Sequence, residues 1–394
     1  MKNDPIVIVS CARTPIGGFL GCFKEVPASQ LGGFAIKEAV NRAQLNSNDI
    51  DEVIMGCVLQ AGQGQAPARQ ASINADLSKS VPCSTINKMC GSGMKAVMLA
   101  HDALLAGSNN IMVAGGMESM SMAPYLLDRA RAGYRMGHGT VTDHMFLDGL
   151  EDAYDKGRLM GCFAEECAKE YHFTREAQDQ FAITSLQRAQ QAIANGSFQK
   201  EITPVTVKTK QGDIQVTIDE QPTNAKPDKI PLLKPAFDKN GTVTAANSSS
   251  ISDGASAMVL MRRSEALQRG LIPLATIKGQ ASHAQAPDLF TTAPISAINK
   301  LLIKTGWDIN DIDLFEINEA FAVVAMAAIK DLSLSSEKVN VHGGACALGH
   351  PIGASGTRII TTLIYALRQY QLKRGVAALC IGGGEATAMA IEVE

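Results

Sequence analysis

The chain has 394 residues, enough for two or three domains with sizeable hydrophobic cores. Its 36 Lys and Arg residues against 39 Asp and Glu residues give a formal net charge of −3, which excludes a basic protein that coats nucleic acid and a strongly acidic scaffold. A hydrophobic fraction of 46% with 19% charged residues excludes bulk disorder and is typical of a globular enzyme.

Apolar strands and amphipathic helices alternate near both ends of the chain. The first part predicts, in order, a strand at 6–10, a helix at 31–42, a strand at 53–59, a helix at 93–107 and a strand at 111–114. A middle region follows, with a helix at 175–195 and a polar stretch at 200–235. The last part predicts a strand at 314–317, a helix at 354–368 and a strand at 376–381. This alternation favours layered α/β units.

The two outer parts are related by an internal repeat. Residues 48–51 (NDID) recur as 310–313, and residues 92–95 (SGMK) recur as 355–358 (SGTR). The dipeptide at 35–36 recurs at 297–298, and the glycine pair at 115–116 has a looser counterpart at 383–384. Because these matches keep the same order at nearly the same offset, we predict two copies of one unit, with an insertion on the first copy.

The cysteines and the apolar runs indicate the cellular compartment of the protein. The nine cysteines are odd in number and show no CxxC pair or paired metal spacing, so we expect a reducing compartment and no metal site. The N-terminal apolar stretch is too short for a signal peptide, and the longest apolar run, 320–329, is about half a membrane span. We therefore expect a soluble cytoplasmic protein with no nucleic-acid or membrane partner.

A glycine-rich turn at 87–93 (NKMCGSG) carries the first candidate catalytic residue. Cys90 lies just before a predicted helix, where the helix dipole and free N–H groups favour a thiolate. The alternative is a buried, inert cysteine, and the local sequence leaves the two interpretations about equal.

A second glycine-rich turn, at 342–356, occupies the matching place in the second copy. A pseudo-two-fold arrangement would bring the two turns together and make His350 the partner of Cys90, since a thiol needs an adjacent base. His342 is a competitor, for which a structural role is favoured.

Strand ends of the second copy add further candidates. Cys380 closes the last predicted strand before a Gly-Gly-Gly turn, and Asn318 and Glu319 follow the strand at 314–317. Ligands of open α/β sheets gather at the carboxyl ends of strands. Two cysteines, a histidine and an amide suit acyl transfer. Neither turn has Walker spacing, and no GxGxxG follows a strand, so nucleotide hydrolysis and hydride transfer lack support.

Six ordered blocks now make the sequence resemble the thiolase family, specifically its acetyl-CoA acetyltransferase (acetoacetyl-CoA thiolase) branch. The blocks are 87–93, 115–124 (GGMESMSMAP), 235–254, 318–322 (NEAFA), 343–356 and 380–385. The resemblance implies the thiolase fold, with two pseudo-symmetric α/β/α/β/α layered domains and an inserted loop domain that binds coenzyme A. The domains would be 1–121 plus 245–271, 122–244 (coenzyme A binding and tetramerisation) and 272–394.

The resemblance also implies the chemistry. The reaction would be reversible thiolytic cleavage of acetoacetyl-CoA, or condensation of two acetyl-CoA, through an acetyl-Cys90 thioester. His350 would activate Cys90, and Cys380 would handle the α-carbon proton. Asn318 would fix a water in the oxyanion hole for the enolate, and the N–H groups of Cys90 and Gly382 would form the hole for the tetrahedral intermediate.

Coenzyme A and its thioesters would be substrates, with no separate cofactor. The implied contacts are Ser249, Leu150, Met160, Phe237, Ala320 and Phe321, with Lys226 near the adenine. For the apolar members the alternative is ordinary core packing. The sequence departs from the family at His342, usually Asn; at Thr223, where an Arg often stacks near the adenine; and at Phe290, where some members have Met.

Other functions stay open at this point. The main alternative is a longer-chain 3-ketoacyl-CoA thiolase of fatty-acid β-oxidation, although Met160 resembles the residue that shortens the pocket of acetoacetyl-CoA enzymes. A decarboxylating ketoacyl synthase would not use Cys380 before Gly-Gly-Gly, and a non-enzymatic relative would have lost Cys90, His350 or Cys380. The loop around 135–138 corresponds to the tetramerisation loop of related enzymes, so we expect a homotetramer.

Overall fold

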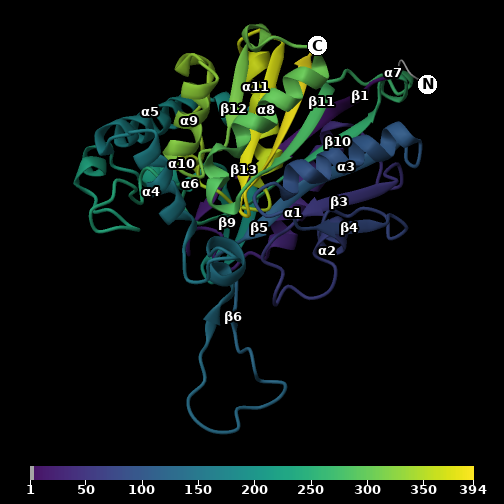
Figure 1. Cartoon of the computed structure of the whole chain (residues 1–394). Helices are drawn as coiled ribbons and strands as arrows, with labels where there is room; N and C mark the ends of the chain where they lie inside the picture. The colour runs from purple at the N-terminus through teal and green to yellow at the C-terminus, as the bar shows by residue number, and fades with distance from the viewer. Residues whose placement is uncertain (1–3) are drawn as a thin grey trace.

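The computed structural model of the protein describes residues 4–394 and has a ten-stranded sheet at its centre (Figure 1). The first half of the sheet contains β1 (Ile6–Arg13), β2 (Gly17–Gly18), β3 (Glu52–Gly56), β4 (Cys83–Ile86), β5 (Ile111–Ser119) and β10 (Ser252–Arg262). The second half contains β11 (Ala275–Ala284), β12 (Leu314–Ile317), β13 (Arg374–Ile381) and β14 (Glu385–Val393). The strand order is β12-β13-β14-β11-β1-β10-β5-β3-β4, with β2 paired to β10.

The two halves have matching strand orders about the β1–β11 junction. Reading outward, β1-β10-β5-β3-β4 corresponds to β11-β14-β13-β12. In both halves the first two neighbours pair antiparallel and the next pair, β5–β3 or β13–β12, runs parallel. Even β4 has a counterpart, because Phe315 of β12 forms an isolated parallel bridge with Val339. The repeat predicted from the sequence is therefore present in the topology.

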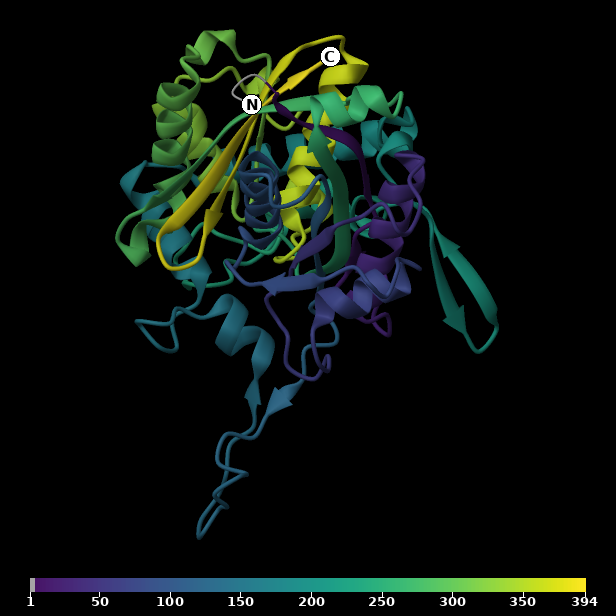
Figure 2. The same cartoon turned by 90° about the vertical axis from the view of Figure 1, so that its right-hand side faces the viewer.

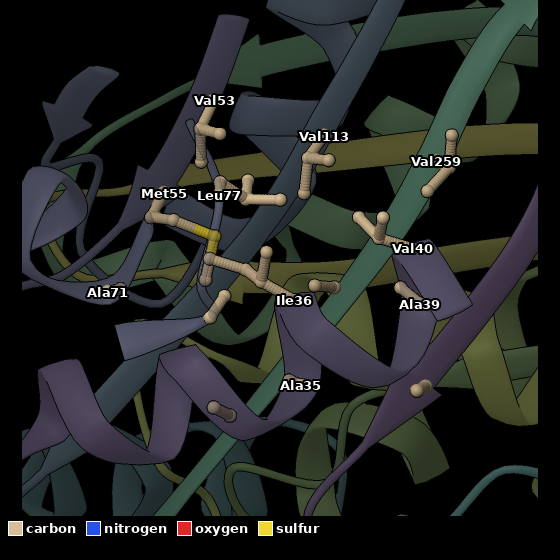
Figure 3. Close-up of a cluster of buried hydrophobic side chains, with 14 of the residues drawn as sticks. Ala35, Ile36, Ala39, Val40, Val53, Met55, Ala71, Leu77, Val113 and Val259 are labelled. Carbon is tan, nitrogen blue, oxygen red and sulfur yellow. The ribbon is translucent and has the colours of Figure 1, made fainter. Parts of the chain in front are cut away.

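Helices pack against both halves of the sheet. They are α1 (Ala28–Arg42), α2 (Pro67–Asn74), α3 (Ser92–Ala106), α7 (Arg263–Gln268), α8 (Ala293–Thr305), α9 (Ala322–Asp331), α10 (Ala345–Leu348) and α11 (Ser355–Gln369). Alternate residues of one strand face different layers: Val7 packs with α1 and α2, whereas Ile6 and Ile8 pack with α3 and α11. Figure 3 shows the α1 layer, with Ile36 and Val40 directed at the sheet.

The central layer of α3 and α11 joins the two halves and produces the α/β/α/β/α arrangement expected from the resemblance. One core cluster combines residues of both helices with strands of both halves, while α8 and α9 cover the outer face of the second half. The helices meet where the SG pairs repeat: a Cβ on Gly93 would lie 2.9 Å from the Thr357 nitrogen, and one on Gly356 would lie 2.3 Å from the Met94 nitrogen. Only glycine permits this approach from both sides.

The insertion between β5 and β10 contains separate small elements. They are β6 (Tyr125–Leu126), β7 (Thr142–Asp143), a π-helix (Phe146–Leu150), α4 (Met160–Glu170), α5 (Arg175–Ala194), β8 (Val205–Thr209), β9 (Gly212–Val216) and α6 (Glu220–Asn224). The insertion also contains short 3-10 turns at Ser197–Lys200 and Pro227–Leu232. Further 3-10 turns occur in the second half of the fold, at Pro287–Thr292, Ile309–Asp311 and Ser336–Lys338. The β6–β7 arm and the β8–β9 hairpin project from the body (Figure 2). Among residues 4–394, no helix has the length and apolar character needed to cross a membrane.

A buried ion cluster fastens the insertion to β1. Arg13 is 0% exposed and donates two hydrogen bonds to Asp219, at 2.7 and 2.9 Å, and one to Glu201 at 2.5 Å. Removing the Arg13 guanidinium would leave two buried carboxylates without this cation, and breaking a buried pair costs about 3–5 kcal/mol in comparable cases. The insertion is thus held in a fixed position beside the sheet.

Three predicted strands differ from the structure at their carboxyl ends, and those expected at 6–10 and 111–114 continue to Arg13 and Ser119. The strand expected at 53–59 stops at Gly56, although the Cys57 N–H still donates to the Ile86 carbonyl of β4 at 3.0 Å. The backbone N–H groups of Val58 and Leu59 donate instead to the buried carboxylate of Glu118. The domain boundaries stay predictions, and residues 1–3 of the first predicted domain lie outside the described residues.

Candidate active site

The turn that carries Cys90 connects β4 to α3 in a constrained conformation. Met89, directly before the cysteine, has a φ of +47°, a region that non-glycine residues seldom adopt. The Ser92 hydroxyl closes the turn by accepting the Lys88 N–H at 2.8 Å and donating to the Met89 carbonyl at 2.6 Å. The helix begins at Ser92, so Cys90 lies two residues before its first turn. The short loop and its serine therefore fix the direction of the sulfur.

The His350 ring is oriented by a second serine. Its Nδ1 lies 2.5 Å from the Ser355 hydroxyl, which donates to the Pro351 carbonyl at 3.0 Å. Because that hydroxyl uses its hydrogen on Pro351, it accepts from Nδ1–H, which leaves a lone pair on Nε2. The Asn318 amide nitrogen lies 3.4 Å from Nε2. The tautomer assigned by this network makes Nε2 the basic atom.

Sequence analysis missed Ser355, although a signal was present. The repeat aligns Ser355 with Ser92, and each serine closes the glycine-rich turn of its own copy.

Both turns face one cavity of about 600 Å³. The predicted residues that line it are Cys90, His350, Cys380, Gly382, Ser249, Leu150, Met160, Phe237, Ala320 and Phe321. Asn318 is not part of the lining; it is 1% exposed, and its amide nitrogen lies next to His350 Nε2. Lys226 is exposed and lies outside this lining, so its contact with the adenine stays a prediction. Residues that the sequence did not single out, among them Met89, Leu147, Tyr154 and Ile352, also line the cavity.

Burial controls the protonation of the site. Desolvation raises the pKa of the Cys90 thiol to about 11, although hydrogen bonds from the Gly382 and Cys90 N–H groups act in the opposite direction. Burial thus raises the pKa of this thiol, whereas the sequence argument expected the helix N-terminus to favour the thiolate. Desolvation also lowers the pKa of His350 to about 3, with the nearby Arg358 charge adding to the effect. The resting pair is a neutral thiol beside a neutral imidazole.

Cys380 is the second sulfur of the cavity. It is 1% exposed at the end of β13, and desolvation, followed by the charge of Cys90, raises its pKa well above the usual value. Both sulfurs line the same cavity, and the charge of Cys90 acts on Cys380 there. Only one of them is readily ionised at a time.

Aromatic side chains close the inner, apolar end of the cavity. Phe290 is 3% exposed and makes edge contacts with Phe163 and Phe321, at centroid distances of 6.3 and 6.4 Å. Met160 begins α4 and reaches over the Gly382 turn, where a Cβ on Gly382 would lie 3.6 Å from its sulfur. Met160 is the flexible part of this wall, and Phe290 is the fixed part.

The other candidates take structural positions. His342 is 3% exposed, packs against Phe198 and Tyr370 and does not line the cavity, and burial lowers its pKa to about 4. Glu319 is buried and accepts hydrogen bonds from Ser185 and Asn340. Within residues 4–394, no group of three or more His, Cys, Asp or Glu side chains is arranged to hold a metal ion.

Comparison with known families agrees with this architecture. The description "Thiolase, N-terminal domain" matches residues 6–264, and "Thiolase, C-terminal domain" matches residues 271–393. The chain belongs to the thiolase family and is an acyltransferase.

Relatives of known name extend over the whole chain. The acetyl-CoA acetyltransferases of Escherichia coli and Schizosaccharomyces pombe are 51% and 48% identical over 394 residues, covering 100% of this chain and 99% and 100% of theirs. The crystal structure of the Bacillus anthracis acetyl-CoA acetyltransferase has a TM-score of 0.96 at 40% identity, covering 99% of each chain. A thiolase of Ascaris suum in complex with coenzyme A has a TM-score of 0.93 at 44% identity, covering 99% of this chain and 100% of the other.

Proposed function

We propose that the protein is an acetyl-CoA C-acetyltransferase, which cleaves acetoacetyl-CoA with coenzyme A and, in reverse, condenses two acetyl-CoA. One observation carries this proposal: two sulfurs, Cys90 and Cys380, share a cavity with a histidine whose Nε2 lone pair is available. A nucleophile and a second acid–base group at the same place suit a thioester exchange followed by carbon–carbon chemistry.

In the condensing direction, the first half-reaction acetylates Cys90. The Cys90 thiol transfers its proton to Nε2 of His350 as the sulfur attacks the thioester carbonyl of acetyl-CoA. Burial disfavours both the thiolate and the imidazolium, so this ion pair forms only during the reaction. The N–H groups of Cys90 and Gly382, which already point at the sulfur, would stabilise the tetrahedral oxyanion. The bond to coenzyme A breaks, and its thiolate takes the proton of Cys380.

The second half-reaction forms the carbon–carbon bond. The Cys380 thiolate takes an α-proton from a second acetyl-CoA, and the enolate oxygen is stabilised by protonated His350 and a water held by Asn318. The enolate carbon attacks acetyl-Cys90, acetoacetyl-CoA leaves, and His350 returns its proton to the Cys90 sulfur. Thiolysis is the reverse sequence, and no metal or separate cofactor enters the balance.

The short substrate is favoured over the longer chains of fatty-acid β-oxidation. The full-length relatives quoted above bear the name acetyl-CoA acetyltransferase. Met160 and the immobile Phe290 close the inner end of the cavity. Coenzyme A would enter along Ser249, Leu150, Phe237, Ala320 and Phe321, and the coenzyme A complex of the Ascaris suum thiolase supports a site of this kind.

We further propose a cytoplasmic homotetramer that takes part in fatty-acid metabolism. All nine cysteines are free, as in proteins of a reducing compartment. The β6–β7 arm projects from the body and exposes Tyr125, Leu127 and Met136, the last at 93% (Figure 1). Apolar side chains on such an arm suit contact with further subunits. If light scattering showed that the fully active enzyme is a monomer, the tetramer would be contradicted.

Acetylation of the enzyme tests the catalytic proposal directly. Incubation with acetyl-CoA should release coenzyme A and add one acetyl group to the peptide that contains Cys90, as read by mass spectrometry. In a separate reaction, the enzyme should consume acetoacetyl-CoA when coenzyme A is supplied with it. An enzyme that cleaves acetoacetyl-CoA without acetylation of Cys90 would contradict the mechanism.

A further inference from the structure

The GGMESMS segment, which the proposed chemistry does not use, contains a buried carboxylate with an unusual set of partners. Glu118 in β5 is 0% exposed. It accepts hydrogen bonds from the backbone N–H groups of Val58 at 3.0 Å, Leu59 at 3.1 Å and Gly353 at 2.9 Å. No cation of the described chain pairs with it. Three backbone donors and the Cys57 thiol, whose sulfur lies 3.6 Å from a carboxylate oxygen, thus hold this acid in the interior without an ion pair.

Those donors come from two different copies of the repeat. Val58 and Leu59 follow β3 in the first half, and Gly353 lies in the turn between His350 and α11 in the second half. The turn before α11 packs very closely against β5. A Cβ on Gly353 would lie 2.7 Å from the Glu118 carboxylate, and one on Gly116 would lie 2.0 Å from the Gly353 carbonyl. The carboxylate therefore joins the two halves directly below the site.

The donors on each side of the Glu118 carboxylate are close, in the chain or by packing, to one member of the Cys90–His350 pair. Gly353 is three residues after His350 and two before Ser355, which orients the imidazole. On the other side, Val58 and Leu59 belong to a small core cluster against which Cys90 packs. A shift of the Glu118 carboxylate would therefore change the separation of the Cys90 sulfur and the His350 ring.

We propose that Glu118 is a positioning residue that sets the geometry of Cys90 and His350 by holding their two turns from below. This inference rests on the proposed function, because it is the Cys90–His350 pair that is positioned. Its charge opposes ionisation of Cys90 and contributes to the raised pKa of that thiol. Glu118 thus improves the geometry while making the thiolate harder to form.

The two effects have opposite signs, which gives a sharp test with Glu118→Gln. Burial raises the pKa of Glu118 to about 7, although its hydrogen-bond donors act in the opposite direction, so the wild type carries the charge above about pH 7. The variant lacks this charge, so alkylation of Cys90 by iodoacetamide, which needs only a thiolate, should proceed at least as fast as in the wild type at pH 8–9. The glutamine NH₂ would face a backbone donor and break the clamp, so acetylation by acetyl-CoA should slow by about tenfold to a hundredfold. Cys380 and His350, which line the cavity with Cys90, are unchanged in this variant.

Two further variants separate positioning from folding. Glu118→Asp keeps the charge but shortens the reach, so acetylation should slow while the pH dependence of alkylation stays that of the wild type. Asp51→Asn is the matched control, because Asp51 accepts the N–H groups of Asn110 and Ile111 at the other end of β5. It should acetylate at the wild-type rate.

The outcomes are distinguishable. If wild-type Cys90 is not acetylated, the proposed function fails before Glu118 is considered. If the wild type is acetylated and Glu118→Gln is acetylated within twofold of it, the positioning role is wrong. A parallel fall of alkylation and acetylation in both Glu118 variants would also overturn it, since that pattern indicates a general loss of structure.

Discussion

The chain-length limit of the cavity can be tested by shortening one side chain, Met160. Its sulfur reaches over the Gly382 turn beside both reactive cysteines, and it shares the inner wall with Phe290. A substrate with several extra methylenes has to displace one of these two residues. Phe290 is wedged between two aromatic rings, so Met160 is the residue that has to move.

The size of the effect follows from packing. Forcing extra methylenes into a filled site costs about 1–3 kcal/mol. At about 1.4 kcal/mol per decade, wild-type kcat/KM should fall by a factor of about 5 to about 140 from acetoacetyl-CoA to 3-ketooctanoyl-CoA. Met160→Ala removes three heavy atoms from the wall, so it should raise kcat/KM for the longer substrate and change that for acetoacetyl-CoA far less. The ratio between the two substrates should therefore narrow.

Thiolysis of a series of 3-ketoacyl-CoA esters measures this ratio. Met326→Ala is the matched control, since Met326 lines a separate pocket beside α5 and α9 and should leave the ratio unchanged. Equal wild-type kcat/KM for the four-carbon and eight-carbon substrates would refute the short-chain assignment. An unchanged ratio in Met160→Ala would show that another part of the wall limits the chain.

Three other substitutions test single residues. Cys90→Ser should abolish activity in both directions, because an alkoxide is far harder to form than a thiolate; Cys83→Ser, at a half-buried cysteine outside the cavity, should stay active. Cys380→Ser should still be acetylated at Cys90 while condensation collapses, and equal loss of both steps would contradict separate roles. His342 has its pKa lowered from 6.5 to about 4, so it stays neutral in the fold while the unfolded chain binds a proton below pH 6.5. Stability is then lost as the pH falls, and His342→Asn should reduce the loss between pH 7 and pH 5 by about 2 kcal/mol, measured by chemical denaturation.

The sequence predicted the large features because each had a local or repeated signal. The SG pairs at 92–93 and 355–356 recur since both helices need a glycine where they cross. The strand at 314–317 agrees residue for residue with β12, because Asp313 before it and Asn318 after it mark its beginning and end. Most of the predicted site residues line one cavity, because the repeat already paired the two turns.

What the sequence could not reveal depends on contacts between distant segments. Glu118 reads as one acid in an otherwise apolar strand, and nothing near it in the chain indicates that its partners are at 58–59 and 353. The same contact explains the wrong strand end at 57–59, since apolar residues predict a continuing strand until a buried acceptor diverts their N–H groups. The pKa of Cys90 has a similar origin: the helix start is visible in the sequence, but the burial that raises this pKa comes from both halves of the fold. The chemistry of this site therefore depends on how the two copies are joined as much as on the residues that each copy supplies.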